Sequence, residues 1–153
     1  MPDLSLATHP QATEISRLIV GLASYFVPDA DAEAVKPFLA SISPAAIEML
    51  IANPAFAYYT ATIESTVVGV AAVRENKHVY HLFVAPELHG QGIARLLWQH
   101  AKHQAELTGN SGTFTVNAST FAVPVYERLG FKVASEAAEK NGVRFVPMVY
   151  RQA

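Results

Sequence analysis

The sequence predicts an α/β fold of the α+β kind, in which helices flank a mixed, mostly antiparallel sheet. The chain has 153 residues, and 51% of them are hydrophobic, which is enough for one domain with a substantial core. Gly, Pro and Asn divide it into short periodic segments in the order β, α, α, β, β, β, α, β, α, β, β. No internal repeat or long linker interrupts this order, so we expect a single domain over residues 1–153.

The first segments are expected to form a strand followed by helices. Residues 4–8 alternate like a strand, and Pro10 suits the first turn of a helix that runs to about Phe26. After a polar link, Ser43 followed by Pro44 is typical of an N-cap with proline at the first helical position. Asn53 and Pro54 should end this helical region.

Three strands are expected next. Residues 56–63 and 67–74 are strand-like runs joined at Glu64 and Ser65, which indicates a hairpin, and residues 78–84 form the third run.

The last third should contain two helices and three more strands. A helix is expected at 90–108, because Ile93, Leu97 and Ala101 recur at helical spacing. The remaining predicted elements are a strand at 112–117, a short helix at 121–129 and two strands at 131–138 and 143–150. Asn141-Gly142 between the final strands is a strong hairpin signal.

Composition excludes several classes of function. The formal net charge is -2 and Lys and Arg form no stripe, so we expect no nucleic-acid partner. The longest apolar runs are far shorter than the roughly 20 residues of a membrane helix, so no membrane partner is expected either. Without a cysteine there is no disulfide or thiol nucleophile. No export segment is apparent, and a cytoplasmic location is the expectation.

The stretch "HLFVAPELHGQGIARLLWQHA" at 81–101 changes from an apolar strand through a glycine bend to an amphipathic helix. The N-terminus of a helix carries unpaired N–H groups and a partial positive charge, so it binds phosphate where glycine lets the anion approach. A Rossmann dinucleotide site is the first alternative, but "GQGIAR" lacks the third glycine and the later acidic residue. An ordinary helix start remains the second alternative.

Two separated motifs resemble the GNAT family of N-acetyltransferases. Residues 84–94, "VAPELHGQGIA", resemble the family's coenzyme-binding motif, with His89 where the family usually has Arg or Gln. Further on, Asn117, Ala122 and "VYERLGF" at 125–131 resemble its next motif. The resemblance implies a GNAT-like sheet with splayed central strands, acetyl-CoA as donor and a primary amine as acceptor.

The same resemblance implies a set of coenzyme-binding residues. The pantetheine arm is expected to pair with the strand residues, the diphosphate with the bend, and the Leu82 N–H is expected to bind the acetyl oxygen. The residues concerned are Leu82, Phe83, Val84, His89, Gly90, Gln91, Gly92, Ile93, Ala94, Arg95, Asn117 and Tyr126.

Tyr126 and His78 are the expected proton-transfer residues, with Leu82 beside them at the acetyl group. Tyr126 resembles the family's general acid, and the alternative is a tyrosine that only packs. His78 stands where some members have a glutamate base, and a merely packed histidine is the alternative. Strand alternation predicts that His78, Tyr80 and Leu82 share a face that His81 does not. No metal site is expected, and His100 and His103 are interpreted as solvated.

Two groups of residues are candidates for the acceptor site. Tyr25, Phe26, Phe38, Tyr58 and Tyr59 either line an aromatic slot or pack in the core. Asp29, Asp31 and Glu33 either attract a cationic amine or are solvated. The leading hypothesis is an amine N-acetyltransferase, and the alternative is a non-catalytic acetyl-CoA sensor. A serine hydrolase is remote, because no Gly-x-Ser-x-Gly elbow occurs. A homodimer stays open.

Overall fold

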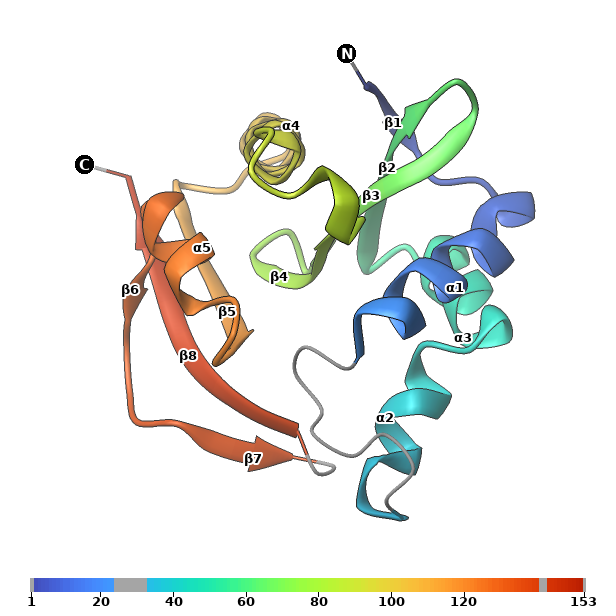
Figure 1. The fold of residues 1–153 in the computed structure, drawn as a ribbon. Helices are drawn as coiled ribbons and strands as arrows, with labels where there is room; N and C mark the ends of the chain where they lie inside the picture. The colour runs from blue at the N-terminus through green and yellow to red at the C-terminus, as the bar shows by residue number, and fades with distance from the viewer. Residues whose placement is uncertain (1, 24–32, 141–142, 153) are drawn as a thin grey trace.

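The computed structural model describes residues 2–23, 33–140 and 143–152. It contains an eight-stranded sheet in the order β1-β2-β3-β4-β5-β8-β6, with β7 paired to β8 (Figure 1). The strands are β1 (Asp3–Leu6), β2 (Phe56–Ile63), β3 (Thr66–Arg74), β4 (His78–Val84), β5 (Thr113–Ser119), β6 (Lys132–Val133), β7 (Ala138–Lys140) and β8 (Val143–Arg151). The helices are α1 (Ala12–Leu22), α2 (Lys36–Ser41), α3 (Pro44–Ala52), α4 (Ile93–Leu107) and α5 (Val123–Arg128).

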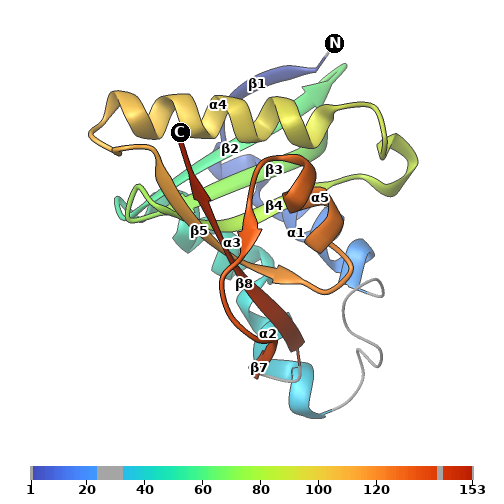
Figure 2. The same cartoon turned by 90° about the vertical axis from the view of Figure 1, so that its left-hand side faces the viewer.

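Helices cover both faces of the sheet (Figures 1 and 2). Helices α1 and α3 pack on one face of β2, β3 and β4, around Ile15, Ile47 and Val70. Helix α4 crosses the opposite face, where Leu97 packs on the same strands and Trp98 packs with β5 and β8. Every strand pair is antiparallel except β4 with β5. The predicted mixed, mostly antiparallel fold is therefore confirmed.

Local signals account for several element boundaries. The Ser43 hydroxyl accepts a hydrogen bond from the Ala46 N–H at 3.2 Å, so Ser43 is the predicted N-cap of α3. Glu64 and Ser65 have φ of 50° and 66°, as a tight hairpin of β2 and β3 requires.

Three predicted elements differ in the structure. The expected strand at 131–138 is wrong as one element, because β8 pairs with two separate short strands, β6 and β7. The fourth helix begins at Ile93 rather than near Gly90, because Gly90 and Gly92 both have φ of +82° and cannot be helical. The first helix ends at Leu22 with Ala23 as its C-cap, and residues 24–26 of its predicted range lie outside the described residues. The turn residues Asn141 and Gly142 also lie outside them, although Lys140 pairs with Val143.

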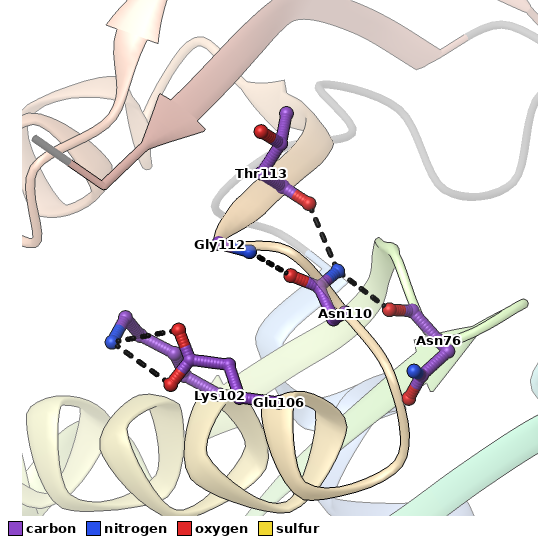
Figure 3. Close-up of polar contacts among 6 residues, drawn as sticks. All are labelled: Asn76, Lys102, Glu106, Asn110, Gly112 and Thr113. Atoms are coloured by element: carbon purple, nitrogen blue, oxygen red, sulfur yellow. Dashed lines mark hydrogen bonds and ion pairs between the residues drawn. The ribbon is translucent and has the colours of Figure 1, made fainter.

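An asparagine network fixes the end of the sheet where β4 and β5 begin (Figure 3). The Asn110 side-chain amide donates to the main-chain oxygens of Asn76, at 2.8 Å, and Thr113, at 3.0 Å, while its oxygen accepts from the Gly112 N–H. The Asn76 amide in turn donates to the Ala105 carbonyl of α4 at 3.0 Å. The β3–β4 turn, the end of α4 and the start of β5 are thus held together.

No helix in the described ranges is long and apolar enough to cross a membrane.

Candidate active site

The central strands pair only over the first two residues of β4 and the third and fourth residues of β5. Their parallel pairing joins His78 to Thr115 and Val79 to Val116, and no pair follows in the register. The strands therefore separate beyond Val79, which leaves a split in the middle of the sheet.

Two residues of β4 offer main-chain groups to this split. The Ala85 N–H donates to the Val68 carbonyl at 2.8 Å, so Ala85 faces β3. Because residues of an antiparallel strand alternate in the direction of their main-chain groups, Phe83 also faces β3, and Leu82 and Val84 face the split. Of the strand residues expected to pair with pantetheine, Phe83 is thus wrong as a main-chain partner, although its side chain lines the site.

A bulge changes the faces of β4. The register pairs Ala72 with His81 and Val73 with Val79, which leaves Tyr80 as an extra residue. Tyr80 consequently packs towards α1 and α3, on the same side as His81, whereas Leu82 packs towards α4. The prediction that His78, Tyr80 and Leu82 share a face that His81 does not is therefore wrong, because the extra residue interrupts the alternation.

The glycine bend leads directly into the N-terminus of α4. Gly90 and Gly92 both have φ of +82°, and a Cβ built on either would meet no atom within 4 Å. The space beside the bend is open, and Gly92 as N-cap has no side chain to occupy the first-turn N–H groups of Ile93, Ala94 and Arg95. This arrangement offers main-chain donors to an anion.

One cavity, called the first cavity below, lies between the bend, β4 and α5. It has a volume of about 490 Å³. Most residues expected to bind the coenzyme line it: Leu82, Phe83, Val84, His89, Gly90, Gly92, Ile93, Ala94, Arg95 and Tyr126. Gln91 does not line it. Arg128, which the sequence reasoning missed, does, and its carbonyl accepts a hydrogen bond from Arg95 Nη2 at 3.0 Å.

The second cavity, of about 310 Å³, opens on the other side of the split. His78, Tyr80, Asn117 and Phe38 line it, so Asn117 lies with the second cavity rather than with the first. The two cavities share five lining residues, namely Leu82, Phe83, Ser119, Ala122 and Tyr126. Ser119 was also missed, because a serine at a strand end carries no distinctive signal.

Tyr126 stands at the junction of the cavities. Its side chain is 6% exposed, and its ring packs edge-on against Phe131 with centroids 5.3 Å apart. The hydroxyl makes no hydrogen bond with the residues that the structure describes. Burial raises the pKa of Tyr126 above its ordinary value, so the hydroxyl keeps its proton at neutral pH.

Two histidines of β4 lie beside the second cavity. His78 Nδ1 is 2.7 Å from the Thr115 hydroxyl oxygen, and burial, with Arg74 nearby, lowers the pKa of His78 to about 4. His81 Nδ1 is 2.9 Å from the Tyr58 hydroxyl, and burial lowers its pKa to about 3. Both rings are therefore neutral at pH 7, and His78 is a weaker base than its ordinary pKa of about 6.5 predicts.

The other residues expected near an acceptor lie in different parts of the structure. Phe38 lines the second cavity, whereas Tyr58 and Tyr59 are core residues. Glu33 forms a 2.8 Å ion pair with Lys36. Tyr25, Phe26, Asp29 and Asp31 lie outside the described residues. Within the described ranges, no group of three or more His, Asp or Glu side chains is arranged to hold a metal ion.

Comparisons with protein families and with solved structures agree on one family. Residues 26–152 match the family model described as the acetyltransferase (GNAT) domain. No curated protein sequence matches the chain. Among solved structures, a GCN5-related N-acetyltransferase from Rhodopseudomonas palustris is 20% identical, with a TM-score of 0.80 over 99% of this chain and 96% of that one.

Two further structures share the fold and contain coenzyme A. The PaiA N-acetyltransferase from Thermoplasma acidophilum, in complex with coenzyme A, is 15% identical, with a TM-score of 0.82 over 99% of each chain. An aminoglycoside 6'-N-acetyltransferase complexed with coenzyme A is 13% identical, with a TM-score of 0.70 over 96% of this chain and 95% of that one.

Proposed function

The chain belongs to the GNAT family of acetyltransferases, and we propose that it transfers an acetyl group from acetyl-CoA directly to a primary amine of a small molecule or peptide. The observation that carries this proposal is the shared wall of the two cavities at the split between β4 and β5. A thioester in the first cavity and an amine in the second would meet beside Tyr126. The family supports an enzyme rather than the non-catalytic sensor.

The first cavity fits the coenzyme in shape and polarity. The bend before α4 supplies first-turn N–H donors for the diphosphate, and Arg95 and Arg128 add positive charge to the same wall. The Leu82 main-chain groups and the Val84 N–H, which face the split, can pair with the pantetheine amides as a further strand would, whereas the Val84 oxygen already accepts from His89 Nε2. Coenzyme A in two neighbours of the same fold supports this assignment.

Direct transfer requires one bond to form and one to break. The amine nitrogen attacks the thioester carbonyl carbon, and the C–N bond forms as the carbonyl oxygen gains negative charge. The Leu82 N–H, which faces the split, is the proposed donor to that oxygen. The C–S bond then breaks, the thiolate takes a proton from the Tyr126 hydroxyl, and the nitrogen loses a proton. Tyr126 afterwards regains its proton from water.

The raised pKa of Tyr126 defines how it can act. A thiol has an ordinary pKa near 8.5, well below that of a buried tyrosine, so transfer of the Tyr126 proton to the sulfur is uphill unless burial raises the pKa of the departing thiol as well. A hydroxyl that is always protonated can instead hydrogen-bond to the sulfur and release its proton as negative charge accumulates there.

His78 is the proposed acceptor of the amine proton, directly or through a water. It lines the second cavity, and its Nδ1 is fixed by Thr115, which leaves Nε2 as the other ring nitrogen. With a pKa of about 4, His78 stays neutral at physiological pH but does not retain a proton. The proton must therefore pass on to water.

A thiol-release assay with acetyl-CoA and a panel of amines and peptides tests this proposal. We expect acetyl-dependent release of free coenzyme A with at least one acceptor, and a product heavier by one acetyl group. If acetyl-CoA binds but no primary amine across the panel is acetylated, direct amine transfer is wrong.

A further inference from the structure

The second cavity carries positive charge although the whole chain has a formal net charge of -2. Arg74, at the end of β3, and Lys140, at the end of β7, line it from opposite sides of the split. No aspartate or glutamate lines this cavity in the described part of the chain. A ligand in the cavity therefore meets cations and aromatic rings.

Neither of these two cations forms an ion pair with a carboxylate of residues 2–23, 33–140 or 143–152. The ion pairs among the described residues involve other lysines, Lys36 and Lys102. The Arg74 guanidinium carbon lies 6.0 Å from the centre of the Tyr80 ring, a contact that leaves its N–H donors available. Arg74 also contributes to the lowered pKa of His78, so its charge acts at the site where the amine would react.

Arg144 also lines the cavity but is a weaker candidate. It stands opposite Glu139 in the β7–β8 ladder, so an acidic side chain shares its face of the ladder. Lys140 pairs with Val143 and points to the other face of that ladder, away from Glu139. No ion pair joins Arg144 to Glu139, but Arg74 and Lys140 have no acidic residue opposite them in their ladders, so the charge that binds an anion is assigned to these two.

The coenzyme does not account for these charges. Its phosphates are assigned to the first cavity, where the helix N-terminus, Arg95 and Arg128 supply positive charge. Arg74 and Lys140 line only the second cavity. Two cations at the acceptor side would repel a polycationic amine and attract an anion.

We infer that the acceptor is an amine that also carries a carboxylate, which Arg74 and Lys140 bind while the amine lies near the split. Phe38, Tyr80 and Phe145 line the same cavity, so an aromatic or apolar body between the two groups fits it. Arg and Lys are the side chains that bind carboxylates through charge-assisted hydrogen bonds. This inference rests on the proposed function, because it takes the second cavity as the acceptor site.

The test compares two ligands that differ only in the anion. Binding of para-(aminoethyl)benzoate and para-(aminoethyl)benzamide is measured by calorimetry on the protein with coenzyme A present, so that no turnover occurs. We expect the acid to bind at least about tenfold more tightly than the amide. In the double variant Arg74→Gln/Lys140→Gln this preference should disappear, and in the matched variant Lys132→Gln, which removes an exposed cation outside the cavity, it should remain.

The inference is overturned if the amide binds as well as the acid, or if the preference survives in the double variant. Thiol release with acetyl-CoA, measured in parallel, separates this result from the proposed function. A preference for the acid without any turnover would leave the charge inference standing and remove the transferase reaction on these amines. Equal turnover of the acid and the amide would support the transferase reaction and contradict the inference that the acceptor carries a carboxylate.

Discussion

His89 Nε2 lies 2.7 Å from the main-chain oxygen of Val84, so the side chain of the bend is tied to the strand at the edge of the split. A carbonyl oxygen can only accept, which places the proton of this bond on Nε2. The main-chain N–H of His89 donates to the Pro86 carbonyl at 3.2 Å, so it is already paired within the bend. The structure adds a positioning role for the imidazole.

Removing this side chain should weaken coenzyme binding. In the His89→Ala variant the bend loses a hydrogen bond of about 1 kcal/mol, so the Kd for acetyl-CoA should rise about fivefold, with kcat little changed. Calorimetric titration with acetyl-CoA measures the Kd. The neighbouring Gln91→Ala variant keeps the main-chain N–H and removes a side chain outside the cavity, so it should bind normally. Equal affinities of the two variants would contradict the positioning role.

A carboxylate at the bend should prevent coenzyme binding. Saturation at a hundredfold the Kd adds about 2.7 kcal/mol to the stability of the native state, which should raise Tm by several degrees. In Gly92→Glu the added negative charge would lie in the open space beside the N-terminus of α4, and this rise in Tm should vanish.

Gly109→Glu is the matched control for backbone strain. Gly109 also has a positive φ, +112°, and open space at its Cβ position, but it lies beyond the other end of α4. Both variants should lose about 1 kcal/mol of stability from the left-handed conformation. Only Gly92→Glu should lose the coenzyme-induced rise in Tm. If acetyl-CoA raises the Tm of both variants equally, the diphosphate does not bind at the bend.

Short-range patterns made the bend predictable, whereas long-range register hid the faces of β4. Glycines before a helical repeat define a positive-φ bend within a few residues of sequence. The bulge at Tyr80 depends instead on how β3 pairs with β4, and "HVYHLFV" itself alternates normally. Similarly, the contact of Asn110 with Asn76 spans 34 residues of sequence, and neither asparagine differs from an ordinary turn residue.

The burial of single catalytic side chains was also not predictable from the sequence. The sequence predicts proton-transfer roles for His78 and Tyr126 but not their burial, which lowers the pKa of His78 and raises the pKa of Tyr126. The position of Tyr126 beside the split was predictable from its motif, because the whole of "VYERLGF" maps to α5 and the turn after it.

The buried His81 should make the protein lose stability in mild acid. The pKa of His81 is about 3 in the folded protein and near 6.5 in the unfolded chain, so between these values only the unfolded chain binds the proton. Lowering the pH from about 6 to about 4 should therefore reduce the free energy of unfolding by about 1.4 kcal/mol per pH unit for this residue. The loss of stability follows from the burial of His81, which is 7% exposed. His78, whose pKa is also lowered, adds a smaller effect of the same sign.

Urea unfolding across this pH range measures the slope. The His81→Gln variant keeps a hydrogen-bonding group for Tyr58 but cannot take up the proton, so its slope should be smaller by about one proton. His103→Gln, at an exposed position on α4, should keep the slope of the unmodified protein. Identical slopes for His81→Gln and the unmodified protein would show that His81 is not held neutral by burial.

Removing the Tyr126 hydroxyl should slow the chemical step and leave coenzyme binding intact. Tyr126→Phe keeps the ring that packs against Phe131 and deletes only the group proposed to protonate the sulfur. General acid catalysis contributes about a hundredfold to ten-thousandfold, so kcat should fall within that range while the Kd for acetyl-CoA changes little. Because burial keeps the hydroxyl protonated, Tyr126 should cause no loss of rate as pH rises to about 10.

The Tyr150→Phe control, in the aromatic core outside both cavities, should retain the native kcat. A native rate in Tyr126→Phe, on an acceptor for which chemistry limits turnover, would assign Tyr126 to packing and the thiolate's proton to water.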